Sequence, residues 1–75
     1  ELYDQAIEYL TKSLDKEETI SALRLRALAY TKKDDWNEAK TDLDKALKLE
    51  PNNDLVQKEL DNVVRMLQLL HQKRS

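Results

Sequence analysis

Apolar residues recur at intervals of three and four along much of this chain, which is the spacing of one face of an α-helix. The first run predicts an amphipathic helix over 2–14. Its apolar positions are Leu2, Tyr3, Ala6, Ile7, Leu10 and Leu14. A short charged segment, residues 15–18, follows it. The next run predicts a helix over about 20–32, which is started by Glu18 or Thr19.

Polar residues delimit a third predicted helix. A turn at residues 32–35 precedes it, and Asp35 with Glu38 matches a capping box, in which each side chain accepts a hydrogen bond from a backbone N–H at the helix start. Pro51 ends the helix, because the residue before a proline is pushed out of the α-helical region. The pattern therefore predicts a helix over about 36–49.

The final predicted helix is the longest. Asp54 and Gln57 repeat the capping pattern, and the helix extends over about 55–72, or about 27 Å at 1.5 Å per residue. Its apolar residues step by four, three, four and three, which is the spacing of a heptad seam. The seam residues are Val56, Leu60, Val63, Leu67 and Leu70. The chain is thus expected to be all-α, with roughly four helices.

The first and third helices share one apolar pattern at an offset of 33 residues. The matched pairs are Tyr3 and Trp36, Ala6 and Ala39, Leu10 and Leu43, and Leu14 and Leu47. We therefore expect the first helix to be the second half of a repeat whose first half is missing. Because stacked repeats bury their apolar faces against their neighbours, this helix is expected to have an apolar face that nothing in the chain covers.

The order of small and bulky residues across 23–53 resembles the tetratricopeptide repeat, a helix–turn–helix unit of about 34 residues. The family pattern is Trp-x-x-Leu-Gly-x-x-Tyr, then Ala-x-x-x-Phe, then Ala and Pro. The residues in register with it are Tyr30, Ala39, Leu43, Ala46 and Pro51. Leu23, Arg26 and Ala27 stand where the family has Trp, Leu and Gly.

The resemblance implies an antiparallel helix–turn–helix array in one domain, residues 1–75. Its parts are the second helix of a truncated repeat (1–15), a full repeat (19–53) and a long C-terminal capping helix (54–74). The small residues Ala27 and Ala39 are expected where two helix backbones approach closely. The bulky residues expected to fill the seam are Tyr30, Trp36, Leu43 and Leu47.

The composition excludes several kinds of chemistry. The 75 residues include no glycine and no cysteine, so glycine-dependent phosphate loops and thiolate metal sites are excluded. A net charge of −2 gives no general attraction to nucleic acid or acidic membranes, and no apolar run approaches the ~18 residues that span a bilayer. We therefore expect no nucleic-acid or membrane partner, and a cytoplasmic location.

The titratable residues do not indicate catalysis. His71 is the only histidine, and a position in the last turn of a helix suits it electrostatically. Calcium loops of the EF-hand type need a glycine, which is absent. The carboxylates that we attribute to solvated helix faces and caps are Glu17, Glu18, Asp34, Asp35, Asp42 and Asp44. The chain is therefore expected to be no enzyme and to need no cofactor or metal.

The family resemblance implies a concave groove lined by the first helix of each unit, where extended peptides bind. On the helix over 20–32 the groove positions are Arg24, Leu28 and Thr31. A shift of 34 residues places Lys58, Asn62 and Arg65 at matching positions of the last helix. Arg24 is then expected beside Lys58 and Thr31 beside Arg65. Such an electropositive stripe suits a peptide with carboxylates, because ionised partners form the stronger hydrogen bonds.

A closer resemblance is to the final repeat of co-chaperones such as the large immunophilins. It is carried by residues 23–27, 37–39, 45–47, 51–53 and 56–60. Members of that group often bind the Glu-Glu-Val-Asp tails of heat-shock chaperones through a clamp of Lys, Asn and Arg. Two of the clamp positions fall on Ser21 and Leu25, and neither is basic. Arg24, one position away, is a candidate substitute for the clamp arginine.

The end of the last helix is a second candidate surface. Met66, Leu67, Leu69 and Leu70 spread around more than one helix face, and exposed apolar patches usually mark interaction sites. Three functions remain open. The chain is a peptide-binding or protein-binding adaptor with a chaperone among its candidate partners, a self-association segment, or a regulatory tail of an enzyme such as a prolyl isomerase whose catalytic domain lies outside these residues.

We predict that the chain forms homodimers, because the first helix and the last helix both carry apolar side chains that one small core cannot cover. Sedimentation velocity across a concentration series should show a mass that rises toward that of a dimer. A mass that stays monomeric at all concentrations contradicts this prediction and shows that the half repeat is tolerated alone.

Overall fold

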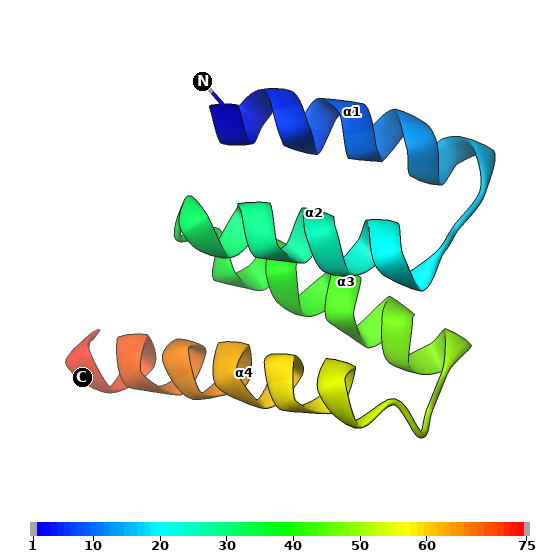
Figure 1. Cartoon of the computed structure of the whole chain (residues 1–75). Coiled ribbons are helices and arrows are strands. Elements are labelled where there is room, and N and C mark those ends of the chain that lie inside the picture. Colours follow the sequence, from blue (N-terminus) through cyan, green and yellow to red (C-terminus); the bar gives the residue numbers. More distant parts are fainter. Residues whose placement is uncertain (1, 75) are drawn as a thin grey trace.

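The computed structural model describes the backbone of residues 2–74 and the side chains of residues 2–72. Across these residues the chain forms four helices and no strand (Figure 1). The helices are α1 (Leu2–Lys16), α2 (Ile20–Lys32), α3 (Trp36–Leu49) and α4 (Asp54–Arg74). The predicted bounds hold for α2 and α3 and differ by one or two residues for α1 and α4. The expected all-α array is confirmed.

Each helix packs on the next one along the chain: α1 on α2, α2 on α3, and α3 on α4. Short connections reverse the chain direction each time, so both described ends of the chain lie on the same side (Figure 1). The molecule is flat, with principal extents of 41 × 34 × 15 Å. In so thin an array the core is small, and each helix keeps a face toward solvent.

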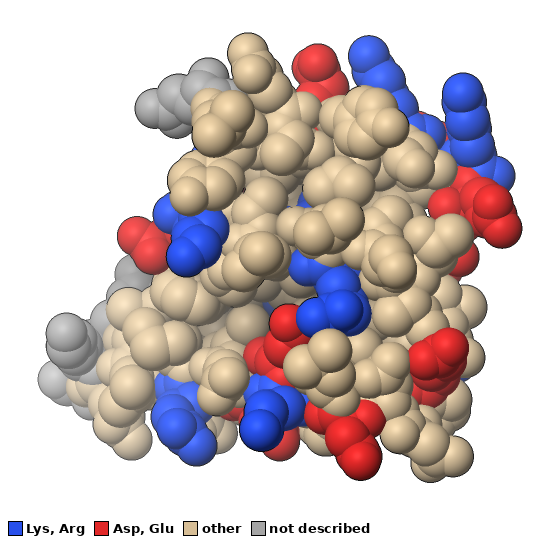
Figure 2. Space-filling model, in the orientation of Figure 1, with Lys and Arg blue, Asp and Glu red and all other residues tan. Residues whose placement is uncertain are grey.

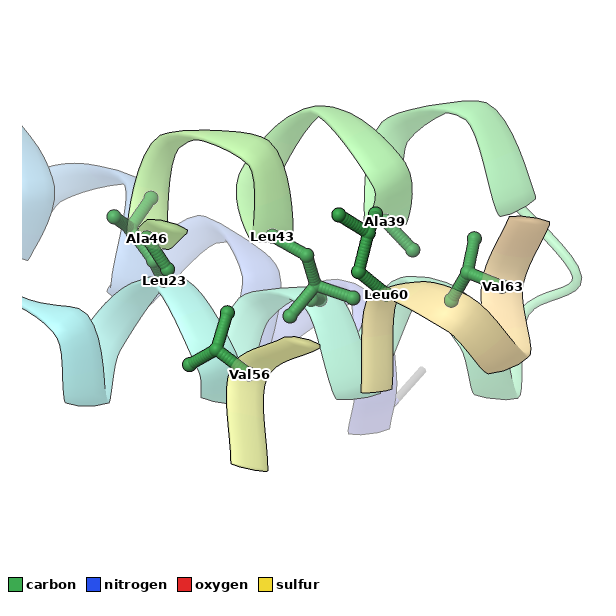
Figure 3. Packing of buried hydrophobic residues seen from close by; sticks show 8 residues of the cluster. Leu23, Ala39, Leu43, Ala46, Val56, Leu60 and Val63 are labelled. Carbon is green, nitrogen blue, oxygen red and sulfur yellow. The ribbon is translucent and has the colours of Figure 1, made fainter. Parts of the chain in front are cut away.

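The core lies between α2, α3 and α4. Figure 3 shows leucine and valine side chains of α4 directed toward α3. The buried cluster consists of Leu23, Ala27, Ala39, Leu43, Ala46, Val56, Leu60 and Val63. Partly buried Tyr30, Trp36 and Leu47 pack against it, as predicted for the seam. Ala27 and Ala39 are buried at the α2–α3 contact, where only a small side chain lets two helix backbones approach closely.

The first helix is the least buried. None of the residues of α1 is fully buried. Its Leu14 is partly buried and packs against the core cluster. Leu2 and Tyr9 are 77% and 74% exposed. The predicted uncovered apolar face on this helix is therefore present in the described part of the chain.

A buried ion pair ties α2 to α3. Arg26 donates two hydrogen bonds to Asp42, from Nε to Oδ2 at 2.8 Å and from Nη2 to Oδ1 at 2.6 Å. Its Nη1 also donates to Thr11 Oγ1 of α1 at 3.1 Å. The Asp42 side chain is 2% exposed and that of Arg26 is 14% exposed. The hydrogen bonds to Asp42 raise the pKa of Arg26.

The assignment of Asp42 to a solvated helix face was therefore wrong. Asp42 precedes Leu43 on the side of α3 that meets α2, and there it neutralises Arg26. A buried guanidinium without a partner carries a large desolvation penalty, so the family's Leu position can hold Arg26 only together with a carboxylate. The buried positions of Arg26 and Asp42 therefore depend on each other.

The turn between α2 and α3 is closed without glycine. Asp34 has a φ of 63°, a conformation that Asn and Asp tolerate better than other residues with a side chain. The Asp35 N–H donates to Tyr30 O at 2.8 Å and the Asp34 N–H to Thr31 O at 3.0 Å. This pair of bonds is a Schellman motif, which satisfies two of the last carbonyls of α2.

The two predicted capping boxes, Asp35 with Glu38 and Asp54 with Gln57, do not form as expected. Asp35 is the N-cap of α3 but its side chain makes no capping hydrogen bond, because its φ and ψ of −89° and 70° lie outside the extended conformation of ordinary N-caps. Asn53, rather than Asp54, caps α4: its Oδ1 accepts from the Val56 N–H at 3.1 Å. Gln57 instead donates to Asp61 at 2.9 Å.

The start of α2 follows the prediction. Thr19 is its N-cap, and its Oγ1 accepts a hydrogen bond from the Ala22 N–H at 3.2 Å. At the other end of α2, an ion pair joins Lys33 to Asp4 in the first turn of α1 and lowers the pKa of Asp4. This pair helps to hold α1 along α2.

We predict that Asp42→Ala lowers the free energy of unfolding by about 3–5 kcal/mol, because it leaves Arg26 buried without a partner. Urea denaturation followed by circular dichroism measures the change. The control is Asp44→Ala, which removes a half-exposed pair with Lys40 and should cost about 0.3–0.5 kcal/mol. The double variant Arg26→Leu/Asp42→Leu should regain most of the loss. Equal costs for the two single variants contradict the prediction.

We predict that Asp34→Gly raises the free energy of unfolding by up to about 1 kcal/mol, because glycine adopts a positive φ without a steric penalty. Asp34→Ala should lower it instead, since alanine is incompatible with that conformation. Thermal melts of the two variants beside the parent chain give the comparison. An alanine variant as stable as the glycine variant would show that the turn sets no such demand.

Candidate functional site

A groove of about 420 Å³ lies between α2 and α4, and side chains of α3 form its floor. Its walls combine apolar and charged residues. The lining residues are Arg24, Ala27, Leu28, Thr31 and Lys32 of α2, Trp36 and Leu43 of α3, and Glu59, Asn62, Val63 and Met66 of α4. The groove exists because α2 and α4 both pack on α3 and leave a hollow between themselves.

The structure brings together four of the six residues predicted to line the groove. Arg24, Leu28, Thr31 and Asn62 lie in it. The other two, Lys58 and Arg65, are exposed residues of α4 outside its lining. They place positive charge near the groove without forming its wall.

Arg24 faces Glu59 instead of Lys58. Its Nε donates to Glu59 Oε1 at 2.8 Å and its Nη2 to Oε2 at 3.2 Å. The two side chains are 33% and 35% exposed. The hydrogen bonds that Arg24 donates to Glu59 raise the pKa of Arg24. The prediction of an electropositive stripe through Arg24 was therefore wrong, because a carboxylate on the opposite wall neutralises the charge of Arg24.

A shift of one residue explains this difference. The prediction set α4 against α2 at an offset of 34, whereas the observed pair joins residues 35 apart. One residue turns a helix by about 100°, so Glu59 rather than Lys58 is directed at α2. Sequence reasoning also missed Lys32, Trp36 and Met66 as groove residues. Trp36 was predicted to fill the seam between the helices. It packs against the core there and also lines the groove.

Apolar side chains are unusually exposed on the two groove helices. Leu25 and Leu28 of α2 and Leu55 of α4 each keep about half of their surface in solvent. Figure 2 shows that residues other than Lys, Arg, Asp and Glu cover most of one face of the molecule, and that basic and acidic residues are scattered over it, with both kinds at the lower edge, where α4 lies. Such a surface can hold a chain segment that has both apolar and charged side chains.

The four residues predicted to mediate self-association do not form one patch. Met66 lines the groove, and Leu67 packs against the core. Leu69 and Leu70 remain exposed near the end of α4. The candidate self-association surface is thus reduced to these two leucines on α4 and the open face of α1.

The described residues hold no cluster of three or more His, Cys, Asp or Glu side chains that could bind a metal ion. None of the helices described is long and apolar enough to cross a membrane. His71 is an exposed residue of α4.

A row of helices that alternate in direction and border a shallow groove defines a helical-repeat scaffold. Residues 20–53 match the tetratricopeptide repeat family, so this segment of the chain is a repeat of that family. A tetratricopeptide repeat is a protein–protein interaction module. The match spans α2, which forms one wall of the groove, α3, which forms its floor, and the loop after α3.

Two curated relatives match about two thirds of this chain. Sperm-associated antigen 1 of Homo sapiens is 41% identical over 51 residues, and that of Rattus norvegicus is 43% identical over 51 residues. The matched segment is 68% of this chain and 6% of each relative, so this chain corresponds to a small part of those proteins. No solved structure matches the chain.

Proposed function

We propose that this chain is a non-catalytic interaction module that binds an extended segment of a partner protein in the groove between α2 and α4. The observation that carries the proposal is the groove itself, in which apolar side chains such as Leu28 and Met66 lie beside charged ones. Exposed apolar surface in a concave site is typical of ligand binding. Membership of a family of interaction modules supports the same conclusion.

The partner segment in this proposal is acidic. The helix α2 has no Asp or Glu, although the whole chain has 15 of them and a net charge of −2. Lys32 lies in the groove wall, and Lys58 and Arg65 are exposed on α4. Complementary charge of this kind favours partners with carboxylates and steers their approach.

More specifically, we propose a co-chaperone-like role, in which the partner segment is the acidic tail of a chaperone. The clamp positions Ser21 and Leu25 lack basic side chains, so the tail would be held by apolar contacts and by Arg24 instead. Affinity should accordingly be low, because neither of these clamp positions supplies a charge.

Self-association is the second candidate, and the exposure of Leu2 and Tyr9 on α1 favours it. These residues lie on a helix whose other side packs on α2. Leu69 and Leu70 of a second copy would bury part of that face.

We predict that a peptide ending in Glu-Glu-Val-Asp binds the groove. Titration into the ¹⁵N-labelled chain should shift amide signals around Leu28, Thr31 and Asn62 in two-dimensional NMR spectra. Leu28→Ser should weaken binding about threefold to tenfold, because burial of one leucine side chain contributes about 1.5–3 kcal/mol when complete and less in a shallow groove.

The matched control is Leu49→Ser. Leu49 is 46% exposed against 53% for Leu28, and it lies at the end of α3 away from the groove. This variant should bind the peptide like the parent chain. Shifts that avoid the groove residues, or equal losses in the two variants, contradict binding at this site.

A further inference from the structure

One ion pair spans the groove. Arg24 comes from the α2 wall and Glu59 from the α4 wall, and they meet through two hydrogen bonds. About a third of each side chain is exposed, so both groups are accessible to a molecule that enters the groove. The planar guanidinium presents paired N–H donors to a carboxylate, the geometry that this side chain offers to any carboxylate.

The pair is not needed to hold α4 in place. Val56, Leu60 and Val63 are buried against the rest of the core and fix that helix. An ion pair as exposed as this one contributes little to stability. The bridge can therefore open without unfolding the array.

Apolar side chains flank the pair. Leu28 lies one helical turn after Arg24, and Leu55 lies one turn before Glu59. Both leucines are about half exposed. Met66 lines the groove further along α4. A charged centre with apolar surface on both sides suits an extended segment in which one acidic residue is flanked, two positions away, by apolar residues, since such side chains project to one side.

We propose that Arg24 is the specificity-determining residue of the groove and binds a carboxylate of the partner, which replaces Glu59. This inference rests on the proposed function and names what the groove selects. An incoming carboxylate exchanges one bidentate pair for another, whereas an amide in its place offers the guanidinium a weaker, uncharged acceptor. A segment that binds Arg24 must therefore first displace Glu59. An acidic segment does so at a lower cost in free energy than a neutral segment of the same shape.

Two matched peptides test the inference: acetyl-Leu-Ala-Glu-Ala-Leu-amide and the same peptide with Gln in place of Glu. Their dissociation constants are measured by NMR titration with the parent chain and with Glu59→Gln, Arg24→Gln and the double variant. The parent chain should prefer the acidic peptide. Glu59→Gln should bind it about twofold to fivefold more tightly, the range expected when one exposed ion pair no longer competes. Arg24→Gln and the double variant should lose the preference.

Two exposed residues outside the groove lining supply charge-matched controls. Asp61→Asn removes the same charge as Glu59→Gln, and Lys45→Gln the same charge as Arg24→Gln. Neither should change the ratio of the two affinities.

The outcomes separate the two proposals. If both peptides shift the groove signals equally in the parent chain, or if Glu59→Gln binds the acidic peptide no more tightly, the carboxylate exchange is overturned and groove binding stands. If neither peptide shifts any groove signal, the proposed function itself fails.

Discussion

The close contact between α2 and α3 is the constraint on which the rest of the structure depends. Ala27, Ala39 and Ala46 are buried in the core cluster, and their small side chains let the two helices approach closely. The outer helices then have fixed surfaces to pack on, α1 against α2 and α4 against α3. A larger residue at these alanines would separate the central pair and displace both neighbours.

The same contact explains how the chain tolerates a charge in its interior. Arg26 stands where the family has an apolar residue, and its partner Asp42 lies on the facing helix. The hydrogen bond to Thr11 extends this tie to α1. Buried pairs of this kind contribute less to stability than their geometry suggests, but they penalise any arrangement that separates the partners. The pair therefore restricts the register of α2 against α3.

The groove follows from the way a flat array is built. With a thickness of 15 Å, the array cannot bury both sides of each helix, so α2 and α4 keep exposed leucines and α3 forms a floor between them. The ion pair between Arg24 and Glu59 closes part of this hollow. The candidate site is thus a consequence of the stacking and of one charge pair, rather than of any local motif.

Local patterns in the sequence by themselves determined the four helices, the repeat predicted over residues 19–53 and the alanines at the central contact, because apolar spacing, the single proline and polar turns act over a few residues. Tertiary structure decided the partners of Arg24, Arg26 and Asp42. Those depend on the rotation of each helix about its own axis. A shift of one residue turns a helix by about 100°, and only the packing of all the side chains together sets that angle.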